Sequence, residues 1–371
     1  MDTFPARRFN ASIVRVGLMC PNPDCEYYRV TAESIHALVG YGSHGKPELI
    51  LDLKCQACGK KFTSRKNTVL YRLKTHSGLV EKIQWLFALG VDASALEEVF
   101  SVREITIRTW LCRSGMQGKK LRERFMLELD LVHVQLNELW ANVKHSTQDM
   151  WVWVVSDATT KIFPVIQVGG RTQEMAYHVV HELKGRLRSG CVPVFSTDGL
   201  KHYFYALTAH FGRWETAEGK KLVWTLLSDN VYAQVIKHQR RRKTVEVERR
   251  ILWGDENNYR ERLKVTGLSG RINTSFVERI NLSIRQSVSK LTRRTWGPAQ
   301  YTPELIEHLE WWRAYYHFVG YHESLEVELA TPSQRKGKQQ SLRYRRRTPA
   351  MVAGLTHKRW TVKELLIYPL S

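Results

Sequence analysis

The chain has 371 residues, of which 43% are hydrophobic and 25% are charged, a composition typical of a folded protein with a substantial core. It contains 57 lysines and arginines against 36 aspartates and glutamates, so its formal net charge is +21. No run of about 18 uncharged apolar residues occurs, and no apolar segment follows the first basic residues, so we expect neither a membrane span nor a secretory signal. The excess positive charge favours a polyanionic partner, nucleic acid first, over the alternative of an evenly basic, soluble surface.

Four of the six cysteines form two close pairs within residues 1–75. Cys20 and Cys25 are separated by four residues, Cys55 and Cys58 by two, and a strand-like stretch lies between the pairs. Paired thiolates at these spacings are typical of a tetrahedral zinc site, and four protein ligands leave no position for a reacting water. We therefore predict that residues 1–75 form a zinc ribbon around one structural Zn²⁺. Four unrelated buried thiols are the alternative.

Residues 76–118 have the pattern of short helices joined by tight turns. Two Ser-x-x-Glu sequences, at residues 94–97 and 101–104, have the spacing of a capping box, which predicts one helix that ends near residue 100 and another that begins near residue 102. The second helix would bury its apolar side and expose a basic one, as a helix-turn-helix does in the major groove of DNA. The candidate DNA contacts there are Arg103, Thr106, Arg108, Thr109 and Arg113. An ordinary helical bundle is the alternative.

After a basic connector at residues 117–124, β-branched and aromatic runs alternate with helical patterns. We predict strands at 131–137, 150–155 and 162–168, a helix at 172–188, a strand at 192–195, a helix at 201–211, a hairpin at 231–237 and 245–252, and a long helix at 274–291. This order predicts an α/β domain over residues 119–328, with a ribonuclease-H-like fold and a basic β-hairpin extension near 231–252. The basic residues between 329 and 371 predict a flexible tail that lies on phosphates or stays solvated.

A ribonuclease-H-like core places its metal ligands at the end of the first strand, at the end of the fourth strand and on a late helix. Two acidic residues of this chain fall at the second and third of these places. Asp198 follows the fourth predicted strand, and Glu278 lies near the start of the long helix. Carboxylates at these places hold two divalent ions that serve phosphoryl transfer. Arg285 lies two turns from Glu278 on the same side of the helix and is a candidate phosphate contact. A turn aspartate and a solvated helix glutamate are the alternatives for the two acids.

Three sequence blocks resemble the DDE transposases of the insertion-sequence-one family. They are Asn-Glu-Leu-Trp at residues 137–140, Ser-Thr-Asp-Gly at 196–199 and Asn-Thr-Ser-Phe-Val-Glu-Arg-Ile-Asn-Leu-Ser-Ile-Arg-Gln at 273–286. In that family the blocks read D-E-x-W, T-D-G and E-R-x-N-x-x-x-R, and a zinc ribbon, a helix-turn-helix and a catalytic core occur in this order. The resemblance covers most of the chain and implies that Asp198 and Glu278 are catalytic metal ligands.

The chain departs from that family at the first catalytic position, where Asn137 stands in place of an aspartate. An amide offers a neutral oxygen, so a site with two carboxylates binds at least one of its ions poorly. Three nearby acids are poor substitutes. Glu138 points to the other side of an extended strand, Asp130 lies near the other end of that strand, and Asp157 has the position of a turn residue. We therefore expect an inactivated site, and the intact surrounding motif favours a deliberate exchange at residue 137 over natural decay.

The resemblance implies a transposase that binds terminal inverted repeats of double-stranded DNA, exposes 3′ hydroxyls and joins them to target DNA with two Mg²⁺ or Mn²⁺ ions. Two DNA ends imply a homo-oligomer of at least two copies, and we expect a cytoplasmic, nucleoid-associated protein of a bacterium or archaeon. The remaining candidate DNA contacts are Arg240, Arg241, Arg242, Arg293 and Arg294. The alternatives are a non-catalytic DNA-binding regulator derived from a transposase and a structure-specific nuclease of the same fold.

Overall fold

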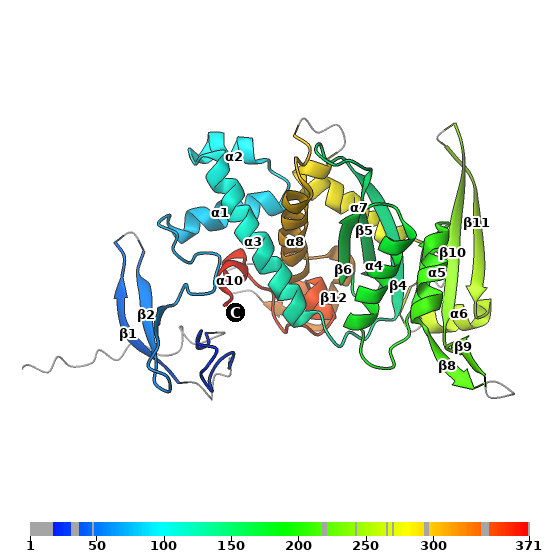
Figure 1. The fold of residues 1–371 in the computed structure, drawn as a ribbon, viewed down its shortest axis with the longest axis horizontal. Coiled ribbons are helices and arrows are strands. Elements are labelled where there is room, and N and C mark those ends of the chain that lie inside the picture. The colour runs from blue at the N-terminus through cyan, green and yellow to red at the C-terminus, as the bar shows by residue number, and fades with distance from the viewer. Residues whose placement is uncertain are drawn as a thin grey trace, which may run out of the picture.

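Three parts follow one another along the long axis of the molecule: an N-terminal ribbon, a helical unit and a unit built around a six-stranded sheet (Figure 1). The structure is a computed structural model and describes residues 18–30, 37–46, 48–216, 221–241, 243–264, 266–268, 271–292, 297–334 and 341–369. All four paired cysteines and all three predicted catalytic positions lie within these ranges.

The ribbon is a three-stranded antiparallel sheet in the order β1-β2-β3. Its strands are β1 (Leu38–His44), β2 (Ile50–Cys55) and β3 (Lys61–Thr63). Leu38 pairs with Cys55, so the end of β2 that carries a cysteine lies beside the start of β1. The core of this part consists of cysteines and a few apolar residues, which is too little buried surface to stabilise such a segment by hydrophobic packing alone.

The helical unit combines helices that are far apart in the sequence. Its members are α1 (Ser77–Ala88), α2 (Ala93–Phe100), α3 (Glu104–Phe125), α8 (Thr302–Phe318), α9 (Pro349–Val352) and α10 (Val362–Ile367). Their shared core includes Trp110, Leu121, Trp311, Trp360 and Leu365. The connector predicted at residues 117–124 is therefore part of α3, because Leu121 is fully buried and continues the apolar side of that helix.

The caps of α2 and α3 differ from the predicted capping boxes. Asp92, which precedes the predicted cap, closes α2 by accepting the backbone N–H of Ser94 (3.4 Å). Ser101 adopts a left-handed conformation (φ 53°) between the helices, and the Glu97 carboxylate accepts the backbone N–H of Glu104 (3.0 Å) at the start of α3. Both predicted helices are present, and their ends are stabilised by other side chains than those expected.

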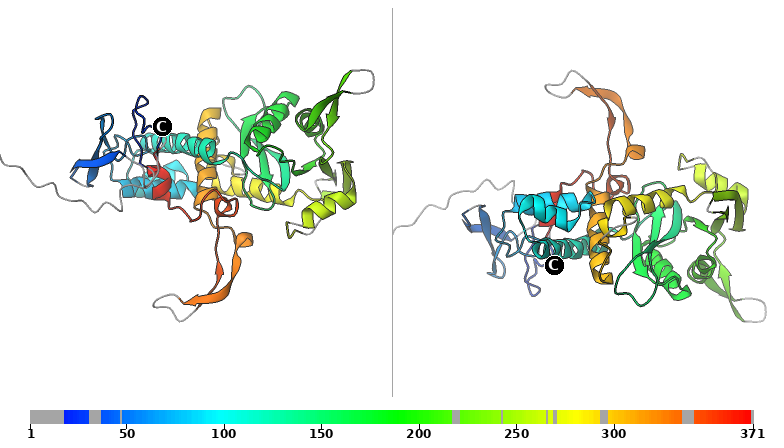
Figure 2. Two further views of the ribbon diagram at one scale, coloured as in Figure 1. Left: turned by 90° about the horizontal axis from the view of Figure 1, so that it is seen from below. Right: turned by 90° about the horizontal axis from the view of Figure 1, so that it is seen from above.

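The tail predicted to be flexible is folded over most of its described length. A hairpin of β12 (Val327–Gln334) and β13 (Ser341–Arg345) projects from the body of the molecule (Figure 2). The chain then returns to the helical unit, where α9 and α10 contribute apolar residues to the core. For the described residues, the prediction of a flexible tail at residues 329–371 is wrong, because the many basic residues in the sequence conceal the few apolar ones that anchor this segment.

Glu48 links the ribbon to the first helix of the helical unit through hydrogen bonds. Its carboxylate accepts hydrogen bonds from the Ser77 backbone N–H (2.8 Å) and hydroxyl, and it pairs with Arg65 (2.5 Å). Burial raises the pKa of Glu48, but the hydrogen bonds from Ser77 and the charge of Arg65 outweigh burial and lower this pKa to about 2. The ionised form of Glu48 is therefore stabilised by the folded state.

We expect this contact to stabilise the fold fully above about pH 4.5, the ordinary pKa of a glutamate, and to lose its effect as the pH falls towards 2. Glu48→Gln should lower the free energy of unfolding by about 1–2 kcal/mol at neutral pH, since water screens part of the ion pair, and by much less near pH 2. Urea unfolding of both forms across this range measures the difference. An equal loss at both ends of the range would contradict the assignment.

The largest part is a mixed α/β unit around a sheet in the order β11-β10-β7-β4-β5-β6. Its strands are β4 (His133–Ala141), β5 (Met150–Asp157), β6 (Val165–Gly169), β7 (Val194–Asp198), β10 (Val231–Arg240) and β11 (Lys243–Trp253). β7 runs parallel to both β4 and β10, and the other neighbours are antiparallel. All the predicted strands are present, and a small hairpin that was not predicted, β8 (Gly212–Thr216) and β9 (Leu222–Leu226), follows the helix at Lys201–His210.

Helices cover both faces of this sheet. α4 (Gln173–Arg186) and α5 (Lys201–His210) pack on one face, and α6 (Glu256–Lys264), α7 (Ser275–Ser287) and α8 pack on the other. Short 3₁₀ helices follow α7 and α8, at Ser289–Leu291 and Glu323–Leu325. Side chains alternate along β4, so that Leu136 packs with α4 and α5 whereas Leu139 packs with α7 and α8. Odd-numbered residues of β4 therefore face α7.

Candidate functional site

The four predicted zinc ligands, Cys20, Cys25, Cys55 and Cys58, come together in the ribbon. The Sγ atoms of Cys20 and Cys58 are 3.6 Å apart, those of Cys25 and Cys55 are 3.8 Å apart, and all four lie within 4.8 Å of one another. Zinc–sulfur bonds of about 2.3 Å in a tetrahedron place the sulfurs about 3.8 Å apart. The cluster is therefore close enough to bind one metal ion and is compatible with structural zinc.

A tight turn holds the second cysteine pair in this geometry. The backbone N–H of Gly59 donates to the carbonyl of Cys55 (2.9 Å), and Gly59 has a φ of 71°, a left-handed conformation that glycine adopts without steric cost. The backbone N–H of Lys60 lowers the pKa of Cys58 to about 6. A thiolate, the form that binds metal, is thus favoured at neutral pH.

We expect the purified chain to carry one zinc ion, and Cys55→Ser to lose it. We expect the ribbon to depend on the ion for stability, because its apolar core is small. Elemental analysis and a cobalt titration, followed by the absorption of cobalt–thiolate bonds, measure occupancy and coordination. Cys112→Ser is the matched control, since Cys112 lies on α3 outside the cluster. Retention of zinc by the Cys55 variant would contradict the assignment.

Asn137 on β4 and Asp198 at the end of β7 are neighbours across the sheet. The two strands are parallel and Leu136 pairs with Thr197, so the next residues, Asn137 and Asp198, stand side by side on the face that α7 covers. Both are partly exposed. Two of the three predicted catalytic positions thus meet at the carboxyl end of β7, where a ligand can reach them.

Gln135 fixes the start of α7 against β4, two residues before Asn137. Its side-chain oxygen accepts the backbone N–H groups of Phe276 (3.1 Å) and Val277 (3.0 Å), and its amide nitrogen donates to the carbonyl of Asn273 (2.9 Å). These bonds satisfy N–H groups in the first turn of α7, which have no partner within the helix. Sequence reasoning missed Gln135, although a second amide two residues before Asn137, on the same face of the predicted strand, is a signal that could have found it.

This anchoring brings Glu278, in the first turn of α7, to the same end of the sheet as Asp198. Oε1 of Glu278 accepts the Thr274 hydroxyl (2.6 Å) and pairs with Nζ of Lys237 on β10 (2.5 Å). Burial raises the pKa of Asp198, and the negative charge of Glu278 adds to the rise, although a hydrogen bond and nearby cations oppose it. The site therefore combines one amide, two carboxylates and one ammonium group.

Glu138 faces α5, on the opposite side of the sheet from Asn137. Its buried carboxylate accepts hydrogen bonds from Nε of Arg171 (2.8 Å) and the hydroxyl of Tyr203 (3.0 Å). Burial raises the pKa of Glu138, and the charge of Asp198 adds to the rise. The carboxylate of Glu138 is thus bound by Arg171 and Tyr203 on the other face of the sheet, next to the predicted catalytic positions.

The other two acids considered as substitutes are engaged elsewhere. Asp157 accepts the backbone N–H groups of Thr159 (3.2 Å) and Thr160 (2.7 Å), which makes it a turn residue as predicted. It pairs with Val134, near the start of β4. Asp130 precedes that strand and pairs with Arg188 (2.7 Å). Neither places a carboxylate beside Asp198.

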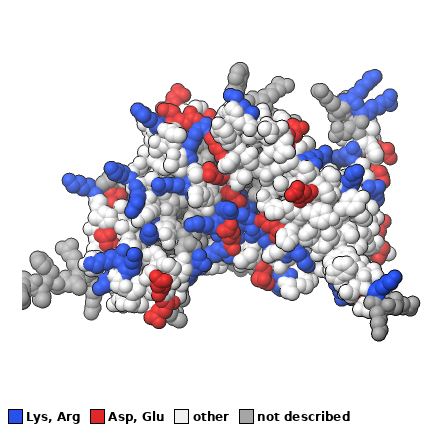
Figure 3. Space-filling model, viewed as in Figure 1, with Lys and Arg blue, Asp and Glu red and all other residues white. Residues whose placement is uncertain are grey.

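Polar and basic side chains lie on the surface at two places predicted to contact DNA. At the start of α3 they are Arg103, which caps the helix, the half-buried Thr106 and the exposed Thr109, and at the tip of the β10–β11 hairpin they are Arg240 and Arg241. Lysine and arginine side chains gather around the outer end of this hairpin (Figure 3). The predicted contacts Arg242, Arg293 and Arg294 lie outside the described residues.

Three further predicted DNA contacts bind groups within the protein. Arg108 pairs with a glutamate on α8. Arg113 donates to the backbone carbonyl of residue 71 (2.9 Å), and Arg285 donates to that of residue 140 at the end of β4 (3.2 Å). These arginines therefore join elements of the fold, and a phosphate would have to compete with these partners for their guanidinium groups.

Neither a protein-family model nor a curated protein sequence matches the chain. Within the part of the chain that the structure describes, no helix is both long enough and apolar enough to cross a membrane.

Proposed function

We propose that the chain is a DNA transposase of the DDE type whose catalytic site is disabled at position 137. The observation that carries the proposal is the convergence of Asn137, Asp198 and Glu278 at one end of the sheet, from two parallel strands and helix α7. Metal ligands for phosphoryl transfer are expected at these three places in such a core. The sequence blocks around them are the ones that resemble insertion-sequence transposases.

The topology of the sheet supports a ribonuclease-H-like core. The first strand of the unit, β4, is central and lies between β5 and β7. The three strands β4, β5 and β6 form an antiparallel meander, after which β7 and β10 add in parallel on the other side. Helices follow β6 and β7, and α7 crosses the opposite face. This is the arrangement in which acids on the first strand, the fourth strand and a late helix meet.

In an active form of this site, Asp198 and Glu278 would hold the divalent ions. Their carboxylate oxygens are ligands that Mg²⁺ and Mn²⁺ prefer. Such ions, when bound, activate the attacking oxygen and stabilise the leaving oxygen of a phosphoryl transfer. Asn137 adds a neutral oxygen, and the ammonium group of Lys237 neutralises Glu278. The donors present therefore fit one weakly held ion better than two.

Other parts of the molecule would supply the DNA contacts. The exposed polar side chains at the start of α3 suit a major groove, and the basic tip of the β10–β11 hairpin suits the phosphate backbone. The net charge of +21 favours association with DNA at low salt. Cutting and joining two DNA ends would bring at least two copies of the chain together.

A non-catalytic DNA-binding protein is the second candidate. It is favoured by the neutral side chain of Asn137 and by the ion pair between Lys237 and Glu278, which together leave the site with little uncompensated negative charge. Such a protein would keep the ribbon, the exposed side of α3 and the basic hairpin. It would have no need for metal ions at the end of the sheet.

The experiment that tests the proposal is a supercoiled-plasmid assay in Mn²⁺ with the chain as it stands and with Asn137→Asp. Nicked and linear plasmid report cutting, and covalently joined end oligonucleotides report strand transfer. Cutting and joining by the Asp form alone supports the disabled transposase. Cutting of branched DNA without joining would support a nuclease instead, and DNA binding without cutting by either form would support the non-catalytic protein.

A further inference from the structure

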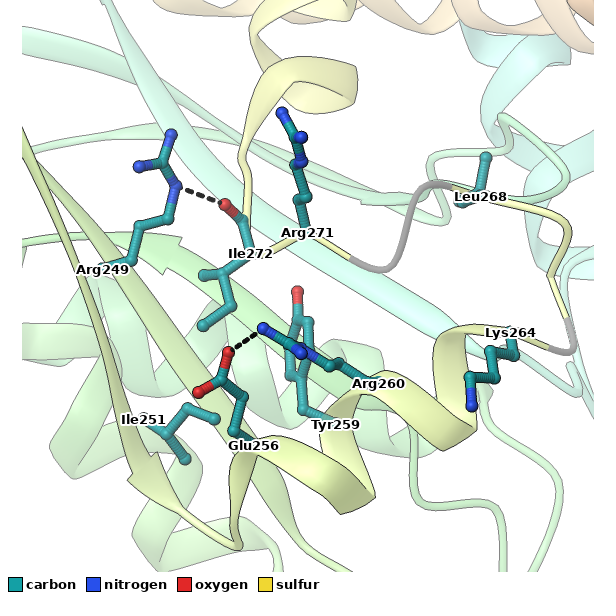
Figure 4. A pocket seen from close by; sticks show the side chains of 9 residues that line it. All are labelled: Arg249, Ile251, Glu256, Tyr259, Arg260, Lys264, Leu268, Arg271 and Ile272. Atoms are coloured by element: carbon teal, nitrogen blue, oxygen red, sulfur yellow. Dashed lines mark hydrogen bonds and ion pairs between the residues drawn. The ribbon is translucent and has the colours of Figure 1, made fainter.

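A basic pocket of about 760 Å³ lies between β11, α6 and the segment that leads into α7 (Figure 4). Its lining residues are Arg249 and Ile251 from β11, Glu256, Tyr259, Arg260 and Lys264 from α6, and Leu268, Arg271 and Ile272 from the following segment. Tyr259 and Ile272 are buried and pack with β10, so the apolar part of the pocket belongs to the core of the sheet unit. The charged residues surround this apolar part.

The charge of the pocket is strongly positive. Four of its nine lining side chains are cations and one is an anion. Arg249 donates from Nε to the carbonyl of Ile272 (3.0 Å), and Arg260 pairs with Glu256 (2.5 Å). Lys264 and Arg271 are exposed at the pocket. Cations that surround a hollow of this size suit a ligand with several separated negative charges better than a single small anion.

The pocket lies on the same face of the sheet as the predicted catalytic positions. Val235 of β10 pairs with Asp198 on one side and with Arg249 on the other, so these three residues form a row across β7, β10 and β11. Paired residues on neighbouring strands point to the same face. Because strands are about 4.8 Å apart, the Cα atoms of Asp198 and Arg249 are about 10 Å apart.

We propose that this pocket binds the phosphate backbone of a DNA strand one or two nucleotides from the bond that reacts near Asp198. One strand of DNA rises about 3.4 Å per phosphate along the helix axis and also winds around that axis, so neighbouring phosphates are farther apart than this rise and the row from Asp198 to Arg249 covers one or two of them. The inference rests on the proposed function, since it takes DNA as the ligand of the neighbouring site. It adds a DNA contact to those proposed for the start of α3 and the hairpin tip.

The test compares the full chain with Lys264→Gln/Arg271→Gln and with a matched control, Arg188→Gln/Arg213→Gln. The control also removes two exposed positive charges, but its residues Arg188 and Arg213 lie away from the pocket. Binding of a 40-base-pair duplex is measured by fluorescence anisotropy between about 50 and 300 mM salt. Thermal unfolding of each variant verifies that it is folded.

We expect the pocket variant to reduce the slope of log K against log salt by about 1–2 and to bind about 10- to 60-fold more weakly at about 0.1 M salt. The control should change affinity by less than about threefold. If the two variants bound DNA with the same affinity and salt dependence, the assignment of the pocket to DNA would be overturned, while the proposed function would still stand. Absence of duplex binding by every form, the unaltered chain included, would instead overturn the proposed function.

A calorimetric titration with pyrophosphate distinguishes DNA from a free phosphate ligand. We expect only weak binding of pyrophosphate to the unaltered chain, because it fills a small part of a 760 Å³ hollow. Tight binding of one pyrophosphate per chain that the pocket variant loses, together with unchanged DNA binding, would assign the pocket to a small soluble phosphate and overturn the proposal.

Discussion

Replacing Asn137 by aspartate is expected to raise the rate of Mn²⁺-dependent plasmid nicking at least about 100-fold, the scale on which one preorganised charged or polar group acts on catalysis. The new carboxylate would stand beside Asp198 across two parallel strands, on the face that α7 covers. A third negative charge would raise the affinity of the site for divalent ions and offset the ammonium group of Lys237. The initial nicking rate, measured against Mn²⁺ concentration, reports both effects.

Two controls make this result specific. Asn67→Asp introduces the same exchange between β3 and α1, outside the sheet unit and the basic pocket, and should leave the rate at its starting level. Asn137→Asp combined with Asp198→Asn should return the rate to that level, since the number of carboxylates is again the same. Equal nicking by the unaltered chain and the Asp form would show that position 137 is not a metal ligand, and another acid would then complete the site.

Gly115→Ala is expected to lower the free energy of unfolding by about 2 kcal/mol, although alanine is the better helix former. Gly115 lies where α3 crosses α8, and a Cβ there would meet the backbone oxygen of Glu307 at 2.4 Å and its Cα at 2.6 Å. Backbone atoms of a packed helix cannot move aside alone, so α3 and α8 would have to separate. Overpacking of this kind costs about 1–3 kcal/mol and outweighs the helix propensity that alanine adds. Urea unfolding measures the change.

The matched control is Gly185→Ala on α4. Gly185 is also helical, but a Cβ there meets nothing within 4 Å. The same exchange should therefore stabilise the chain by about 0.5–1 kcal/mol, through helix propensity and the smaller entropy of the unfolded chain. If both variants changed the free energy of unfolding in the same direction, the close approach of α3 and α8 would not be what restricts residue 115 to glycine.

The sheet unit could be predicted in outline because its elements carry local signals. The run at residues 150–155 is apolar and aromatic and ends near turn residues, and it forms β5. The helix predicted at 172–188 appears as α4, whose cap is Thr172. Patterns of this kind depend on neighbours in the sequence. The register between β4 and β7, which places Asn137 beside Asp198, depends on residues about 60 positions apart and had to be seen in the structure.

The partners of individual side chains could not be predicted in the same way. An arginine on a helix has the same sequence pattern whether it faces solvent or a neighbouring carbonyl, and Arg113 and Arg285 bind carbonyls. Gln135 acts on a helix that begins 140 residues later. Lys237 pairs with Glu278 because β10 lies beside β7, a contact that follows from tertiary structure alone.

The helical unit is assembled from segments that are far apart in the sequence, and this has a consequence for synthesis of the chain. α3 leaves the ribosome about 240 residues before α10, a delay of roughly 10–50 s at ordinary rates of translation. For most of that time α1, α2 and α3 lack the apolar side chains of α8, and until its end they lack those of Trp360 and Leu365, which complete their core. The sheet unit, α8 included, is synthesised within this interval and can fold first. The helices proposed to face DNA are therefore made early but completed late, so a nascent chain would acquire them in final form only after its sheet is finished.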